Sequence, residues 1–188
     1  YEKLYAINNP LTFNESIDYE EFNRKRKVIL IVSRLSEYHK RISVSLRVWA
    51  KLSRDDRFKD WKLKIVGNGP DEQWYKDYVR RKYIPRVEFV NNTNPQQYYK
   101  EASIFLMTSK SEGWGLTLTE ALQNGVVAVV LNTSKVFAEI IKNDICGFLV
   151  NDTREMKKKL VELFVKQVCY HLFVGEYVLK KDSAKVNV

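Results

Sequence analysis

Two carboxylates flank a glycine-rich turn in the middle of the chain. Glu112 and Glu120 lie eight residues apart, with Gly-Trp-Gly at residues 113–115 between them. Residue patterns predict a strand over 102–107 and a helix over 116–124. Glycines let a backbone pass close to a ligand, and the amides that begin a helix can bind an anion. Carboxylates accept hydrogen bonds from hydroxyl groups, so the segment suits a phosphate between two polyols, as in a nucleotide-sugar.

Two cations follow the first strongly apolar segment. Residues 27–33 form a β-branched, apolar run, as expected of a buried parallel strand, and Arg34 comes directly after them, with Lys40 six residues later. Fixed cations in such a place stabilise the charge that develops on a diphosphate leaving group. A solvated loop would show the same two residues, so their meaning depends on what lies beside them.

Two further strand ends carry weaker signals. A second strand is predicted over residues 62–66, and the Gly-Asn-Gly-Pro turn that contains Gly67 follows it. This turn lacks the third glycine of a dinucleotide fingerprint and the Gly-Lys-Ser/Thr of a phosphate loop. Val90 ends a third predicted strand, residues 86–90, where a nucleobase could meet backbone groups.

Strand-like and helix-like segments alternate along most of the chain. This alternation indicates right-handed βαβ units and an α/β fold with a doubly wound, Rossmann-like parallel sheet. Ligands bind such sheets beyond the carboxyl ends of the strands, so the segments described above are expected to meet at one edge. The remaining strands are predicted over residues 126–131 and 147–150.

Length and composition favour one domain with appendages. The chain has 188 residues, of which 45% are apolar, and a net charge of +9 that allows an acidic partner. We expect a lead-in or linker over residues 1–25, a ligand-binding domain over 26–152, and a helix with a tail over 153–188. The two cysteines and two histidines match no metal-ligand spacing, so no metal site is predicted.

In this order, the motifs resemble the C-terminal, donor-binding half of retaining glycosyltransferases with the GT-B fold, and more closely the "glycosyl transferases group 1" family. The resemblance covers about residues 5–155. Ser33 stands where that family usually has glycine before the arginine, and Trp114 stands where it usually has phenylalanine. The motifs that carry the resemblance are Arg34-Leu35 with Lys40, residues 66–70, residues 112–121, Gly125 and residues 146–150.

The resemblance implies a role for each matched residue. Arg34 and Lys40 would hold the donor's diphosphate and Glu112 the hydroxyls of the donor sugar, and these three form the expected catalytic set. Glu120 would bind the ribose hydroxyls. The other implied donor contacts are Gly67, Val90, Gly113, Trp114, Gly115 and Leu116.

The implied reaction is the transfer of a sugar, of the hexosyltransferase type, with retention of anomeric configuration. The nucleotide-sugar is a co-substrate, and neither a cofactor nor a metal is expected. The N-terminal, acceptor-binding domain of the family is missing, so the chain alone is expected to be inactive. The nucleotide stays open between UDP, GDP and others.

Two other functions remain open at this point. A GT-B nucleotide-sugar epimerase would use a similar fold, and a non-catalytic module could bind a nucleotide or nucleic acid through the positive charge. Nucleic acid is not an expected partner, because no nucleic-acid motif is present and the charge is scattered. The resemblance favours a cytoplasmic protein, and the basic excess leaves room for peripheral contact with an anionic membrane face.

Overall fold

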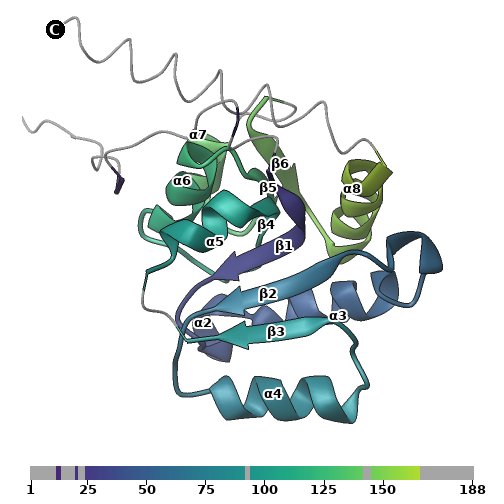
Figure 1. Ribbon diagram of the computed structural model, residues 1–188. Coiled ribbons are helices and arrows are strands. Elements are labelled where there is room, and N and C mark those ends of the chain that lie inside the picture. Colours follow the sequence, from purple (N-terminus) through teal and green to yellow (C-terminus); the bar gives the residue numbers. More distant parts are fainter. Residues whose placement is uncertain (1–11, 14–19, 21–23, 92–93, 142–144, 166–188) are drawn as a thin grey trace, which may run out of the picture.

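A parallel sheet of six strands forms the centre of the described part of the molecule (Figure 1). The computed structural model describes residues 12–13, 20, 24–91, 94–141 and 145–165. The strand order is β3-β2-β1-β4-β5-β6, the order of a Rossmann-type sheet, so the predicted fold class is confirmed. The strands are β1 (Arg26–Val32), β2 (Lys62–Val66), β3 (Val87–Val90), β4 (Ala102–Met107), β5 (Val127–Leu131) and β6 (Gly147–Val150).

Helices cover both faces of the sheet, as the buried apolar runs of the central strands require. Contacts between elements place α3 beside α4 and α8, and place α5 beside α6 on β1 and β4 (Figure 1). No helix in the described ranges is long and apolar enough to cross a membrane. The helices are α2 (Glu37–Lys40), α3 (Ile42–Leu52), the short 3-10 helix η1 (Asp56–Phe58), α4 (Glu72–Arg81), α5 (Gln96–Glu101), α6 (Leu116–Gln123), α7 (Lys135–Ile140) and α8 (Thr153–Val165).

An aromatic contact anchors helix α8 to the segment that precedes β2. Phe164 stacks on Trp61 with ring centroids 4.2 Å apart and meets the edge of Phe58 at 4.8 Å. Met156 and Leu160 on the same helix are buried. The sequence predicts a helix over 153–168, and the last three of these residues lie outside the described ranges.

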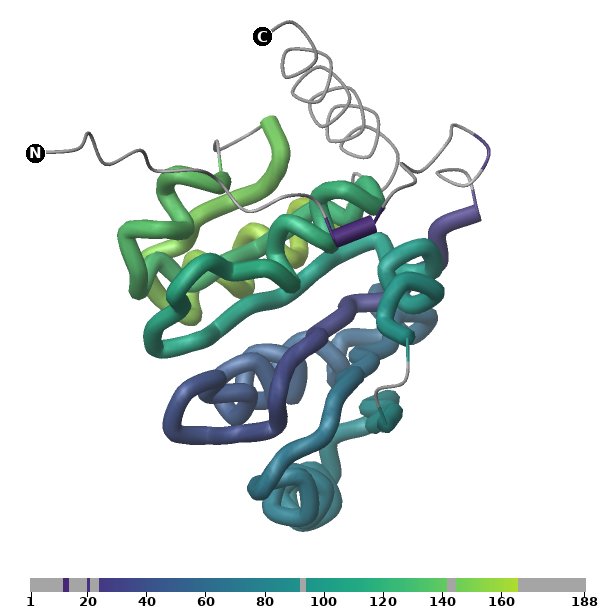
Figure 2. The backbone as a smooth tube through the Cα atoms, turned by 90° about the vertical axis from the view of Figure 1, so that its left-hand side faces the viewer, coloured from purple at the N-terminus to yellow at the C-terminus, as the bar shows by residue number. Residues whose placement is uncertain are grey.

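The lead-in segment touches the domain at Phe13. Its backbone amide donates to Gln123 Oε1 over 3.3 Å, and the Gln123 amide nitrogen donates to the Phe13 carbonyl. Figure 2 shows the short purple piece at residues 12–13 beside the teal helical region. Most of the predicted lead-in, residues 1–25, lies outside the described ranges.

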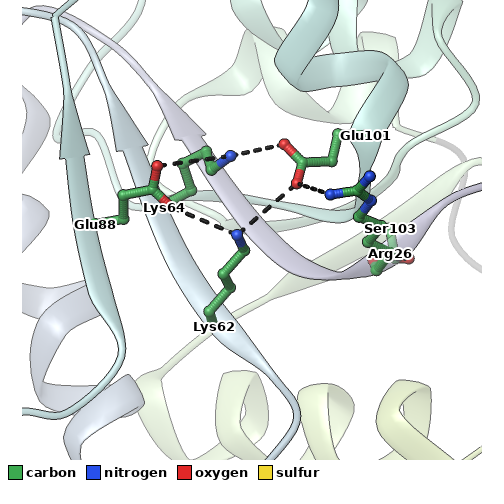
Figure 3. A network of polar contacts seen from close by, with 6 residues as sticks. All are labelled: Arg26, Lys62, Lys64, Glu88, Glu101 and Ser103. Carbon is green, nitrogen blue, oxygen red and sulfur yellow. Dashed lines mark hydrogen bonds and ion pairs between the residues drawn. The ribbon is translucent and has the colours of Figure 1, made fainter.

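A cluster of ion pairs lies toward the amino ends of the strands (Figure 3). Buried Lys64 is 2.6 Å from a Glu101 oxygen and 3.8 Å from Glu88. Lys62 reaches both carboxylates at 3.5–3.8 Å, and Arg26 lies 3.6 Å from Glu101. The cluster joins α5 to three neighbouring strands at the edge opposite the predicted site, so we assign it to stability.

Candidate functional site

The carboxyl ends of β1 and β4 form the point at which the sheet changes winding direction. The chain leaves β1 toward α3 on one face and leaves β4 toward α6 on the other face. Ligands of open α/β sheets bind in the crevice that this divergence creates. A small pocket lies there, and its lining includes Ser33, Lys40, Met107, Thr108 and Ser109.

The structure joins two of the predicted catalytic residues at this point. Lys40 Nζ lies 2.6 Å from Glu112 Oε1, although the two residues are 72 apart in the sequence. Their side chains are 22% and 13% exposed, which leaves a partly buried ion pair with access to solvent. Such a charge-assisted hydrogen bond fixes both groups in place before a ligand arrives.

Arg34, the other predicted cation, is exposed at the exit of β1. Its guanidinium makes no hydrogen bond or ion pair with any described residue, so it is free to meet an anion. A planar guanidinium can bind two phosphate oxygens at once. The structure therefore offers one restrained cation and one unrestrained cation from the same loop.

A partly buried group of hydrogen bonds holds the loop that carries these cations. The Glu37 carboxylate accepts from the Ser43 hydroxyl at 2.5 Å, from the Ser43 amide at 3.2 Å and from the Tyr75 hydroxyl at 2.8 Å. Asp71 accepts from the Glu37 amide at 2.8 Å. Burial, with the Glu37 hydrogen bond, raises the pKa of Tyr75 far above its usual range, so Tyr75 stays a donor.

Arg41 links the β1 exit to the β4 exit, a role that was not predicted from the sequence. Its backbone is left-handed, with φ of 46°, where it joins α2 to α3. Its guanidinium donates to the Thr108 carbonyl at 3.1 Å and to the Ser109 carbonyl at 3.3 Å. The Thr108 hydroxyl lies 2.9 Å from that of Ser45, so both exits share one polar network.

The glycine turn after β2 is packed against the β1 exit. Gly67 has φ of 144°, and a Cβ there would lie 1.9 Å from the Ser33 carbonyl oxygen. Close backbone approach alone therefore explains the glycine. The Gly67 amide donates to the carbonyl of half-buried Val90 at 2.9 Å, which places both residues at the carboxyl edge. Their contact with a donor stays a prediction.

The Gly-Trp-Gly turn begins α6 as the sequence predicts. Gly115 is left-handed, with φ of 76°, and its carbonyl accepts from the amides of Leu118 and Thr119. The amide of Leu116 has no partner among the described residues, so it can meet an anion, helped by the helix dipole. Gly113 is exposed and Trp114 is half-buried, so this turn borders solvent.

Glu120 is more enclosed than the sequence suggests. It is 8% exposed, and the Tyr99 hydroxyl donates to its Oε2 at 2.8 Å. Tyr99 was not identified from the sequence because it lies on another helix, 21 residues earlier. Burial, together with the Glu120 carboxylate, raises the pKa of Tyr99 far above its usual range.

Metal ligands are not grouped in the part of the chain that the structure describes. No three residues of the types His, Cys, Asp and Glu lie close enough there to hold a metal ion. The groups at the carboxyl edge that could meet a ligand include the Arg34 and Lys40 cations, the Leu116 amide and the carboxylates of Glu112 and Glu120. This set can bind a phosphate group and hydroxyl groups together.

Comparison with known proteins decides the family. The model of "Glycosyl transferases group 1" matches residues 13–167. The chain belongs to this family. In this chain the segment from Glu112 to Glu120 leads into helix α6 at the carboxyl edge of the sheet.

Two curated glycosyltransferases illustrate how far the similarity extends. An uncharacterized glycosyltransferase of Haemophilus influenzae is 34% identical over 140 residues, which cover 72% of this chain and 39% of that protein. The amylovoran biosynthesis glycosyltransferase AmsD of Erwinia amylovora is 27% identical over an alignment of length 190. This alignment covers 98% of this chain and 50% of AmsD. The chain thus spans half or less of the length of these relatives.

A solved structure confirms the fold of this glycosyltransferase chain. Staphylococcus aureus TarM, crystallised with fondaparinux, α-GlcNAc-glycerol and UDP, superposes with a TM-score of 0.82 at 21% identity. The superposition covers 95% of this chain and 36% of TarM. At this identity the likeness shows the fold, which is the Rossmann-like α/β fold found in GT-B glycosyltransferases.

Proposed function

We propose that the chain is the donor-binding half of a retaining glycosyltransferase that takes a sugar, of the hexose type, from a nucleoside diphosphate sugar. The observation that carries the proposal is the Lys40–Glu112 pair at the point where the sheet changes direction. One loop supplies a cation for the diphosphate, and the other supplies a carboxylate for the sugar hydroxyls. Arg34 and the free amide of Leu116 add further donors for phosphate oxygens.

The reaction that these residues support is a front-side displacement. The acceptor hydroxyl oxygen forms a bond to the anomeric carbon on the face from which the diphosphate leaves. The bond from that carbon to the phosphate oxygen breaks, and the leaving oxygen takes the acceptor's proton. Lys40 and Arg34 would stabilise the charge on the diphosphate, which is the main requirement of such a step. We propose that no metal or cofactor takes part.

We propose UDP as the nucleotide, supported by the UDP in the TarM complex. The proposal is tested by calorimetric titration of the chain with UDP, GDP and ADP. UDP should bind saturably, and Arg34→Ala and Glu120→Ala should each weaken it. Arg54→Ala is the matched control, because Arg54 is an exposed arginine outside the carboxyl-edge site. Equal weakening by the control, or no effect of either site variant, would contradict the assignment.

Three further parts of the proposal concern the surroundings of the site. An acceptor-binding domain would complete the enzyme, so the chain alone should bind donor without turnover. Activity of the complete enzyme should persist in EDTA. We also propose a cytoplasmic protein in peripheral contact with anionic membranes, supported by the net charge of +9. Sedimentation with phosphatidylglycerol vesicles, but not with phosphatidylcholine vesicles, would support that contact.

A further inference from the structure

A buried tyrosine holds the carboxylate that is proposed to bind the ribose. We propose that Tyr99 is a positioning residue: its hydroxyl fixes Glu120 so that the free side of the carboxylate can accept the ribose hydroxyls. The proposal rests on the donor-binding function proposed above. It assigns a role to a residue outside the motifs that identify the family.

The Tyr99 ring is held from two sides and cannot turn away. The residue is fully buried, and its ring lies 6.1 Å from Phe13 in an edge-to-face arrangement and 6.1 Å from Phe105 in a tilted one. Phe105 belongs to the central strand β4, and Phe13 is anchored by Gln123 on α6. The hydroxyl therefore has one direction in which to donate, toward Glu120.

The donor in this pair is fixed as well as placed. Because burial and the neighbouring carboxylate raise the pKa of Tyr99, its hydroxyl keeps its proton throughout the neutral range. Among the described residues, only Tyr99 bonds to the Glu120 carboxylate, at Oε2. A carboxylate has about four acceptor positions, so those left can accept from two vicinal hydroxyls.

Neighbouring contacts show that Glu120 is held at its backbone too. The Asn124 side chain donates to the Glu120 carbonyl at 2.9 Å, which closes the end of α6. Because Asn124 restrains the backbone of Glu120, the bond from Tyr99 acts on the orientation of the carboxylate plane. A merely structural Tyr–Glu bond would contribute to stability alone, whereas a positioning bond must also change how the ribose is read.

The test compares UDP with 2′-deoxy-UDP in the wild-type chain and in Tyr99→Phe. Loss of one hydrogen bond to the 2′-hydroxyl should make 2′-deoxy-UDP bind about fivefold to tenfold more weakly than UDP to the wild type. In Tyr99→Phe, binding of UDP should weaken toward that of 2′-deoxy-UDP, so the ratio of the two dissociation constants falls toward one. The ring remains, so its packing is retained.

Tyr75→Phe is the matched control. Tyr75 is also fully buried and also donates to a glutamate, Glu37, over 2.8 Å. Removal of the Tyr75 hydroxyl should change the affinity for UDP and for 2′-deoxy-UDP by the same factor, because Glu37 holds the loop proposed to bind the diphosphate. If Tyr99→Phe is unfolded, Phe105→Leu keeps the hydroxyl and loosens the ring, and should lower the ratio part of the way.

Three results would overturn the proposal, each in a different way. A folded Tyr99→Phe with the wild-type ratio would reduce Tyr99 to a structural role. Equal binding of UDP and 2′-deoxy-UDP by the wild type would remove the ribose contact of Glu120, and with it the role of Tyr99. Failure of the wild type to bind UDP, GDP or ADP would overturn the proposed function itself.

Discussion

Neutralising Glu112 should strengthen binding of UDP while it weakens the folded chain. Lys40 Nζ lies 2.6 Å from Glu112 Oε1. Glu112→Gln keeps the shape and one acceptor oxygen but removes the negative charge that competes with a diphosphate for Lys40. Both groups are less than a quarter exposed, so the charge-assisted bond should contribute about 1–3 kcal/mol to the free energy of unfolding.

Part of that interaction becomes available to the ligand in the variant. If about 1 kcal/mol is regained when Lys40 turns to the diphosphate, the dissociation constant for UDP falls about fivefold. Turnover of the sugar donor by the complete enzyme should fall, because Glu112 is proposed to hold the sugar hydroxyls. Calorimetry at fixed ionic strength measures the affinity, and urea denaturation measures the stability.

The chain contains a control of the same bond length. Lys64 and Glu101 are also 2.6 Å apart and mostly buried, but they lie toward the amino ends of the strands (Figure 3). Glu101→Gln should therefore lose stability without gaining affinity for UDP. Weaker or unchanged UDP binding in a folded Glu112→Gln would refute the idea that the Glu112 carboxylate and the diphosphate of the ligand compete for Lys40.

Three further changes test the structure more simply. Gly67→Ala should cost about 3 kcal/mol or more in urea denaturation, because its Cβ would meet a carbonyl oxygen at 1.9 Å, whereas Gly113→Ala, with open space around it, should not change the midpoint. Phe164→Ala should cost about 3–5 kcal/mol, since it removes the ring that stacks on Trp61; a loss below 1 kcal/mol would mean that α8 is not anchored there. Two backbone amides at the start of α8 lower the pKa of Asp152, so its contribution is present above its ordinary pKa of 3.8 and is lost as the pH falls through the lower folded value. Asp152→Ala should accordingly lower the melting temperature at pH 7 and lower it less at pH 3.

The strands could be predicted from sequence because burial on both faces leaves a direct trace in residue type. The predicted bounds of β2 and β6 agree with the observed Lys62–Val66 and Gly147–Val150. Helix α2 was not predicted because its four residues, Glu37–Lys40, are too few to show a helical period. The stacking of Phe164, a residue of α8, on Trp61 was also not predictable. An amphipathic pattern shows that one face of a helix is covered, but not which residues cover it.

The site shows the same division between residue types and contacts. Arg34, Lys40 and Glu112 could be chosen from their places after strands, but the bond between Lys40 and Glu112 depends on β1 and β4 being neighbours. That neighbourhood follows from the strand order, which spacing alone does not determine. The role of Tyr99 could not be predicted for a related reason. A tyrosine ring is typical of any protein core, and only the packing of α5 on α6 directs the Tyr99 hydroxyl to Glu120.

The bonds that hold the loop between β1 and α3 have a consequence for the entropy of ligand binding. Arg41 bonds to the β4 exit, and the Leu35 amide donates over 2.8 Å to the Asn68 carbonyl in the turn after β2, so this loop is ordered before any ligand arrives. A ligand that meets it loses little conformational freedom of the chain on binding. Exposed Gly113, with no atom of the described residues within 4 Å of a Cβ placed there, belongs to the less restrained side of the same crevice. The crevice therefore has one rigid side, the loop between β1 and α3, and one adaptable side, the turn at Gly113. The entropy cost of ordering the chain on binding should come from the adaptable side.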